Sequence, residues 1–254
     1  MNKIRDALLE VVIIILVGGL IGAVLAVVSN LFVMGVQWFG HQREASELLS
    51  VSIGGESISF SSVLFLWAAA AVVVILKTGL GIARWAGPAD SMYAAHQVNE
   101  PLDIKTGLAS TMAAFASASG GGSVGQYGPI VHFGATMGIW VKRFISSRLS
   151  HEIYLGCGVA AAISAGFNAP IAGVIFAHEA ILRHFSVRAI APITVASVSA
   201  SALGNQWFPH TTTFQIDSVL PPLAEVVPIL VALAPAFSLV AICFMWALRY
   251  SAQT

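Results

Sequence analysis

The sequence predicts an all-α, polytopic transmembrane helical protein that combines long apolar helices with short, tilted and broken ones. Its 254 residues are 57% hydrophobic and only 9% charged, and the mean hydropathy is +0.84. A soluble domain carries about 25% charged residues because its surface must be hydrated, so this chain requires lipid as its solvent. The 12 basic and 12 acidic residues leave no charge excess, and nucleic acid is therefore not an expected partner.

The first apolar segment covers residues 7–34. It exceeds both the roughly 7–15 residues of a signal-peptide core and the roughly 20 residues that span hydrocarbon. We expect one long tilted helix, and Lys3 and Arg5 ahead of it favour a cytoplasmic N-terminus. A polar loop over residues 41–57 and a second span over residues 62–76 should follow.

The rest of the chain has shorter apolar pieces, interrupted by glycine, proline and small polar residues. Helices are expected over residues 105–119, 129–141, 153–167, 170–182, 189–203 and 223–248. Broken helices at membrane depth are typical of channel and transporter cores, where their amide ends face the substrate. The alternative is a simple bundle whose small residues allow close packing. Either way we expect one transmembrane domain over residues 1–254.

Glycine is concentrated in one segment, with five glycines in the nine residues from Gly120 to Gly128. This density disfavours a regular helix, and Pro129 suits the first turn of a new one. Residues 125–128 should therefore form the N-terminal end of a helix, which presents free amides and about half a positive charge to an anion. A nucleotide-binding P-loop would need a Gly-Lys-Ser/Thr ending, which is absent from this segment.

Residues 125–129, Gly-Gln-Tyr-Gly-Pro, resemble the Gly-Arg-Glu-Gly-Pro motif of the CLC family of voltage-gated chloride channels and chloride/proton antiporters. Residues 165–176 are similar to the family's Phe-Asn-Ala-Pro-Leu-Ala-Gly helix start. The resemblance implies the N-terminal half of the CLC inverted-repeat fold. The family's later Gly-x-Phe-x-Pro motif has no counterpart, so either a second CLC half supplies it or the product is incomplete. The family's dimeric habit makes a homodimer the other expected partner.

The chain departs from the family at the positions that carry protons. Tyr127 stands where the family has its gating glutamate; a tyrosine, with a pKa near 10, does not cycle its proton at neutral pH but donates a hydrogen bond. Glu179 matches the first member of the antiporters' inner Glu-Glu pair, and Ala180 replaces the second. The family's Gly-Ser-Gly-Ile-Pro motif aligns loosely with residues 85–90, where Ala86 replaces the chloride-contacting serine.

The resemblance thus implies an anion site made mainly of backbone amides, with Tyr127 at the gate position. The expected anion-binding residues are Ala86, Gly87, Gly125, Gln126, Tyr127, Gly128 and Pro129. His132 and Glu179 are possible pathway residues. The alternatives are a packed neutral histidine for His132 and a structural, hydrogen-bonded carboxylate for Glu179.

Other chemistry has little support. His178 and Glu179 begin an HExxH zinc motif, but Leu182 occupies the place of its second histidine. Cys157 and Cys243 lie in apolar stretches without metal-ligand spacing and are interpreted as packing residues. We therefore expect no metal, no cofactor and no enzyme activity.

The predicted function is passive, proton-independent chloride transport by an integral protein of the plasma (cell inner) membrane, with chloride and membrane lipid as its partners. A non-conducting half-length subunit, which folds with a second CLC half, is the first alternative. A chloride/proton antiporter is the second, and His132 is the nearest residue to carry its proton.

Overall fold

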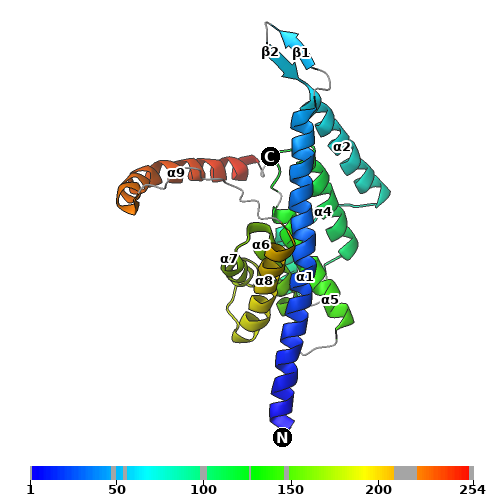
Figure 1. Ribbon diagram of the computed structural model, residues 1–254, viewed down its shortest axis with the longest axis vertical. Coiled ribbons are helices and arrows are strands. Elements are labelled where there is room, and N and C mark those ends of the chain that lie inside the picture. The colour runs from blue at the N-terminus through cyan, green and yellow to red at the C-terminus, as the bar shows by residue number, and fades with distance from the viewer. Residues whose placement is uncertain are drawn as a thin grey trace. The chain divides into compact units, whose positions relative to one another are not determined.

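The computed structural model describes residues 2–46, 50–53, 56–97, 102–125, 127–145, 149–208 and 222–251. It divides into two compact units, Met1–Pro209 and His210–Thr254. In the described part of the first unit the elements are α1 (Asn2–Ala45), β1 (Ser50–Ile53), β2 (Glu56–Ser59), α2 (Ser61–Gly79), α3 (Pro88–His96), α4 (Ile104–Ser119), α5 (Tyr127–Phe144), α6 (His151–Phe167), α7 (Pro170–Phe176), the π-helical turn η1 (Ala177–Leu182) and α8 (Val187–Trp207) (Figure 1).

The expected helices are confirmed, with shifts at their ends. Helix α1 continues to Ala45, and β1 and β2 form an antiparallel hairpin in place of the predicted polar loop. Val51 pairs with Ile58 in this hairpin, and the sequence places two glycines between the strands, the residue type that tight hairpin turns prefer. Helix α3 was not expected as a separate element.

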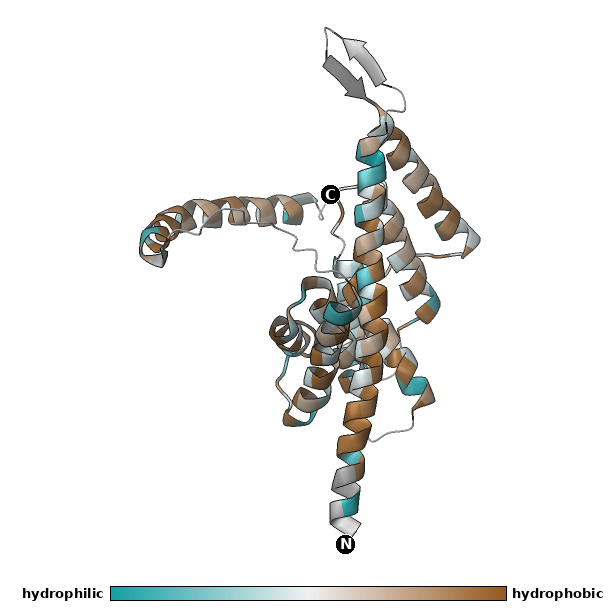
Figure 2. Cartoon of the chain, in the orientation of Figure 1, coloured by the Kyte–Doolittle hydropathy of each residue, from teal (hydrophilic) through white to brown (hydrophobic). Residues whose placement is uncertain are grey.

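Among the described residues, four helices are long and apolar enough to cross a membrane. They cover Leu9–Ala45, Ser61–Gly79, Val187–Trp207 and Ala224–Ser251, and Figure 2 shows apolar residues along them. The chain is an integral membrane protein.

The core of the first unit lies around α6, whose residues from Ile153 to Ser164 are all buried. Helices α5 and α6 pack at backbone contact, because a Cβ atom added at Gly158 would collide with the carbonyl of Gly134. Helix α1 packs in the same way on α8, since a Cβ at Gly22 would lie 2.7 Å from the Ala196 carbonyl oxygen. Small residues thus permit the close approach on which helix packing in membranes depends.

The second unit contains α9 (Leu223–Ser251), a 29-residue apolar helix with Pro228 and Pro235 in its interior. Its described side chains are almost all exposed within the unit. Such a helix needs lipid or other protein around it.

Candidate functional site at the ends of α3 and α5

The N-terminus of α3 is one of the two predicted anion-binding ends. Gly87 is its N-cap residue and Pro88 its first helical residue, a position that suits proline because no helical amide is lost there. The Gly87 amide donates a 2.7 Å hydrogen bond to Asp90 Oδ2, and Asp90 also forms an ion pair with Arg84. A carboxylate from the chain itself therefore occupies the electropositive end of α3.

The Ala86 amide is likewise bonded within the chain. It donates a 2.9 Å hydrogen bond to Ser110 Oγ, which α4 carries. Two of the amides predicted for an anion thus have acceptors already, and an anion at this end would compete with Asp90 and Ser110. Sequence reasoning missed both acceptors. Asp90, three residues after the cap, is the detectable signal, because an acidic residue at that position is part of a capping box.

Helix α5 provides the other predicted end. It begins at Tyr127, two residues before the expected start at Pro129. Gly125 precedes the helix and has open space around it, whereas a Cβ at Gly128 would lie 3.4 Å from Pro88 Cγ. The structure therefore brings the N-terminal turns of α3 and α5 into contact. Gln126 lies outside the described residues.

Tyr127 brings the two family-like motifs, residues 125–129 and 165–176, into contact. Its ring stacks on Phe167, with ring centroids 3.8 Å apart and an interplanar angle of 24°. Phe167 ends α6, and the next residue, Asn168, adopts the left-handed conformation with φ of 52°. The gate position at the start of α5 therefore packs against the break between α6 and α7.

Hydroxyl groups of α8 hold this break in place. Ser201 Oγ donates to Asn168 Oδ1 at 2.9 Å, and Ser197 Oγ donates to the Pro170 carbonyl at 2.8 Å. Ser164 Oγ of α6 donates back to the Ser197 carbonyl at 2.6 Å. Two of these hydrogen bonds end on residues at the start of the break, Asn168 and Pro170, and the third joins α6 to α8.

His132 lies one turn after Gly128 on α5, and its side chain is only 1% exposed. Its Nδ1 atom is hydrogen-bonded to Ser91 Oγ of α3 at 2.9 Å. The bond links the first turn of α3 to the second turn of α5, the two helices whose N-termini form the candidate site. The structure thus places His132 in the packing between α3 and α5; a role in the pathway stays a prediction.

Glu179 lies on η1 with an exposed side chain. Its carboxylate has no hydrogen bond or ion pair to another described residue. Its role, in the pathway or as a structural carboxylate, stays a prediction. The neighbouring His178 is buried and stacks on Phe185, with ring centroids 5.0 Å apart. No cluster of three potential metal ligands occurs among the described residues.

Two helix N-termini that meet beside a broken helix are an arrangement typical of channel and transporter cores. Residues 68–254 match the family model described as "Voltage gated chloride channel". The chain belongs to this family, the CLC family.

Several known proteins are similar to the chain. It is 26% identical over 144 residues to a putative ClcB-like chloride channel protein of Ralstonia nicotianae, covering 55% of this chain and 34% of that protein. It is 23% identical over 195 residues to the voltage-gated ClC-type chloride channel ClcB of Yersinia pseudotuberculosis, covering 72% of this chain and 44% of that protein. The chain therefore spans less than half the length of these relatives.

Two solved structures share the fold. A CLC-type fluoride/proton antiporter superposes with a TM-score of 0.65 and 21% identity, over 86% of this chain and 53% of that one. A slow cyanobacterial Cl⁻/H⁺ antiporter superposes with a TM-score of 0.64 and 17% identity, over 86% and 52%. The chain corresponds to about half of that fold, as the predicted N-terminal repeat implies.

Proposed function

We propose that the chain forms the N-terminal half of a passive anion pathway in the plasma (cell inner) membrane, with chloride as the transported ion and no proton coupling. The observation that carries the proposal is the contact between the N-terminal turns of α3 and α5, at Pro88 and Gly128. Each turn contributes partial positive charge from its amides. Such partial charges stabilise a dehydrated anion without trapping it as a full cationic charge would.

Proton independence is inferred from the residues at the two family proton positions. Tyr127 has an aromatic ring fixed by stacking on Phe167, and Ala180 has no ionisable group at all. A carboxylate that accepts a proton near neutral pH is therefore missing from both positions. No covalent chemistry is needed for such a pathway, so no enzyme activity is proposed.

Asp90 has a regulatory part in this proposal. Its carboxylate accepts from the Gly87 amide, where an anion would bind. For chloride to bind at the N-terminus of α3, Asp90 must first release the Gly87 amide. Its carboxylate would then remain paired with the largely exposed Arg84. The pathway is accordingly expected to conduct slowly in the wild type.

The test is chloride efflux from proteoliposomes that contain the purified chain, with a potassium ionophore to balance charge. We expect efflux without a proton ionophore and without proton uptake. In Tyr127→Glu the efflux should become pH-dependent, because a carboxylate at the first turn of α5 blocks the site when ionised. Tyr127→Phe is the matched control, because it keeps the ring and removes only the hydroxyl. Proton movement that accompanies chloride in the wild type would contradict the proposal and favour the antiporter alternative.

A second candidate function is a half-length subunit that conducts only with a second CLC half or as a homodimer. It is favoured by the match to 53% and 52% of the two antiporter chains. This function predicts that the folded chain gives no efflux alone. Efflux should appear after co-reconstitution with a separately expressed C-terminal CLC half. The mass of the purified chain by light scattering distinguishes a homodimer from a monomer.

A further inference from the structure

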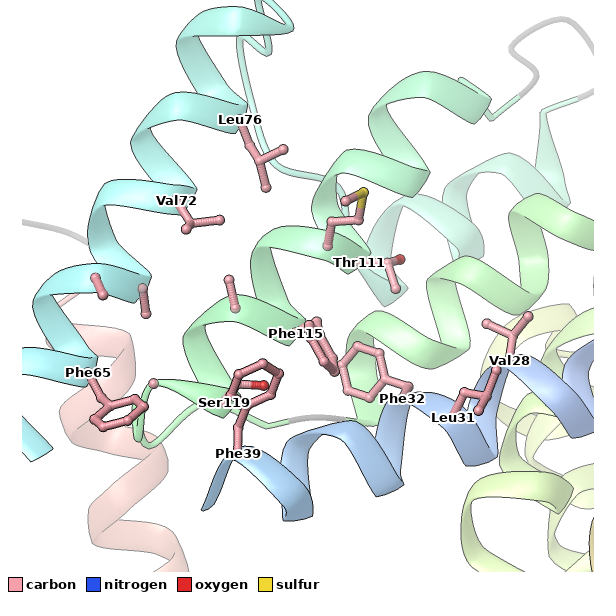
Figure 3. Close-up of a pocket in the computed structure, with 15 residues that line it drawn as sticks. Val28, Leu31, Phe32, Phe39, Phe65, Val72, Leu76, Thr111, Phe115 and Ser119 are labelled. Carbon is pink, nitrogen blue, oxygen red and sulfur yellow. The ribbon is translucent and has the colours of Figure 1, made fainter. Parts of the chain in front are cut away.

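A groove lies between α1, α2 and α4, and Figure 3 shows the side chains that line it. Its volume is about 590 Å³, within the range of roughly 300–1,000 Å³ that small-molecule sites have. The wall is almost wholly apolar and includes Val28 and Phe32 of α1, Val72 of α2 and Phe115 of α4. None of the described residues of the predicted anion site lines it.

Small residues create the groove. At one end α2 and α4 touch, because Gly120 has no side chain and a Cβ there would collide with Ala69. Ala68 of α2 and Ala116 of α4 also line the groove, and their small side chains leave room beside this contact. Larger residues, Val28 and Leu76, line the other end (Figure 3).

The end near Gly120 carries polar groups. Ser119 is 6% exposed, and its hydroxyl has no hydrogen-bond partner among the described residues. Arg43 follows Phe39 of the groove wall by one turn of α1, and its guanidinium lies so close to Gly121 that a Cβ there would collide with it. No carboxylate among the described residues forms an ion pair with Arg43. A buried donor, and a cation that no described carboxylate pairs, thus lie at one end of an apolar groove.

We propose that this groove binds an anionic phospholipid, with one acyl chain between α1, α2 and α4 and the phosphate on Arg43. A phospholipid presents, from water inward, a phosphate, ester carbonyls and acyl chains. The groove presents Arg43, the hydroxyl of Ser119 and an apolar wall in the same order. Guanidinium binds phosphate through two parallel hydrogen bonds, and the Ser119 hydroxyl donates to an ester carbonyl after rotation about its χ1 angle.

Charge, and not apolarity, selects the lipid. Surrounding hydrocarbon is as apolar as the groove wall, so the hydrophobic effect gives an acyl chain little reason to prefer the groove. A concave wall in a bilayer is filled by some chain in any case, and Arg43 then favours the lipid with a net negative headgroup. A zwitterionic lipid with the same acyl chains should therefore bind more weakly.

The groove also adjoins the candidate anion site through α4. Thr111 lines the groove and its hydroxyl lies 3.5 Å from the Pro129 carbonyl oxygen of α5. The adjacent Ser110 accepts from the Ala86 amide. Lipid binding should therefore support the ends of α3 and α5, a consequence that rests on the proposed function; the lipid site itself does not.

The test is native mass spectrometry of the full chain, delipidated in detergent and titrated with phosphatidylglycerol or phosphatidylcholine of identical acyl chains. We expect phosphatidylglycerol to bind the wild type about fivefold more tightly, because both lipids offer a phosphate but only phosphatidylglycerol has a net negative headgroup beside Arg43. Arg43→Gln should remove this preference. Val72→Trp should weaken binding of both lipids by filling the groove, whereas the matched control Val74→Trp, on the same helix and 58% exposed outside the groove, should not.

Equal binding of the two lipids to the wild type would overturn the proposal, as would undiminished binding to Val72→Trp. Ser119→Ala, which changes little volume, serves as a second variant if a tryptophan variant fails to fold, and it should weaken binding of both lipids. A phosphatidylglycerol with a photoreactive acyl chain should label peptides of α1, α2 and α4. Labelling confined to other helices, or a second protein chain cross-linked to the groove, would show a different occupant. Because these experiments measure lipid binding, their outcome is independent of the chloride efflux measurement.

Discussion

Helices α6 and α2 have similar lengths, 17 and 19 residues, and similar apolar character, yet their surroundings are opposite. Helix α6 is buried from Ile153 to Ser164, whereas Ser61 and Ala69 are the only buried residues of α2. The two helices differ in the size of the residues on their surfaces. Helix α6 has Gly156 and Gly158 on faces that other helices touch, while α2 exposes Val, Ile and Leu. In a membrane, small residues and not hydropathy decide which helix becomes the core.

The largest expected effect comes from filling the α5–α6 contact. Gly158→Ala should destabilise the chain by about 3 kcal/mol or more, because its methyl group collides with the Gly134 backbone, which cannot rotate away as a side chain can. Gly19→Ala on α1 is the matched control, since a Cβ there meets nothing within 4 Å; it should be neutral or stabilising by about 0.5–1 kcal/mol. Thermal denaturation in detergent measures both. Equal losses in the two variants would refute the distinction between packed and lipid-facing helices.

The next effect concerns the buried pair that links α3 to α5. Ser91→Ala leaves His132 Nδ1 buried without its 2.9 Å partner, which should cost about 1–3 kcal/mol. His132→Phe in the Ser91→Ala background should recover part of this loss, because both polar partners are then absent. A double-mutant cycle on thermal stability tests the coupling. Additive losses would mean that the hydrogen bond contributes nothing of its own.

Tyr127 should have a smaller effect on stability. Tyr127→Ala removes the ring stacked on Phe167 and should cost about 1–2 kcal/mol, of which about 0.5–1.5 belongs to the aromatic pair. Tyr127→Phe should retain almost all of the wild-type stability, because it keeps the ring. The test is again thermal denaturation, with Phe167→Leu as the partner substitution. If Tyr127→Ala were as stable as the wild type, the stacking would not anchor α5 to the α6–α7 break.

These comparisons also show how much could be predicted from the sequence. The long apolar helix and the short helices followed from residue type, and Pro129 and Pro170 marked new helix starts to within two residues. The candidate site was predicted from the motifs and stays a prediction, and the internal acceptors of its amides were not predicted. The bonds from Ala86 to Ser110 and from Ser91 to His132 join residues 24 and 41 positions apart, and neither has a periodic signal in the sequence.

The smallest effect should appear at the start of α4. Asp103 caps this helix by accepting from the Lys105 amide at 3.2 Å and the Thr106 amide at 3.1 Å. The Thr106 hydroxyl, with these amides, holds the pKa of Asp103 below its ordinary value and outweighs the opposing effect of desolvation. A lowered pKa in the folded state stabilises the protein above the unfolded pKa of about 3.9, and the contribution is lost as pH falls through the folded pKa.

Asp103→Ala should therefore cost about 1 kcal/mol at pH 7 and progressively less below about pH 4, where the wild-type carboxylate also becomes neutral. Thermal denaturation of both proteins between pH 7 and pH 3 measures the difference. Asp103→Asn is the control, because an amide oxygen still caps the helix without a titrating charge, so its stability relative to Asp103→Ala should not depend on pH. A gap between wild type and Asp103→Ala that stayed constant with pH would show that the carboxylate charge contributes nothing. The cap would then act through its hydrogen bonds, independently of charge.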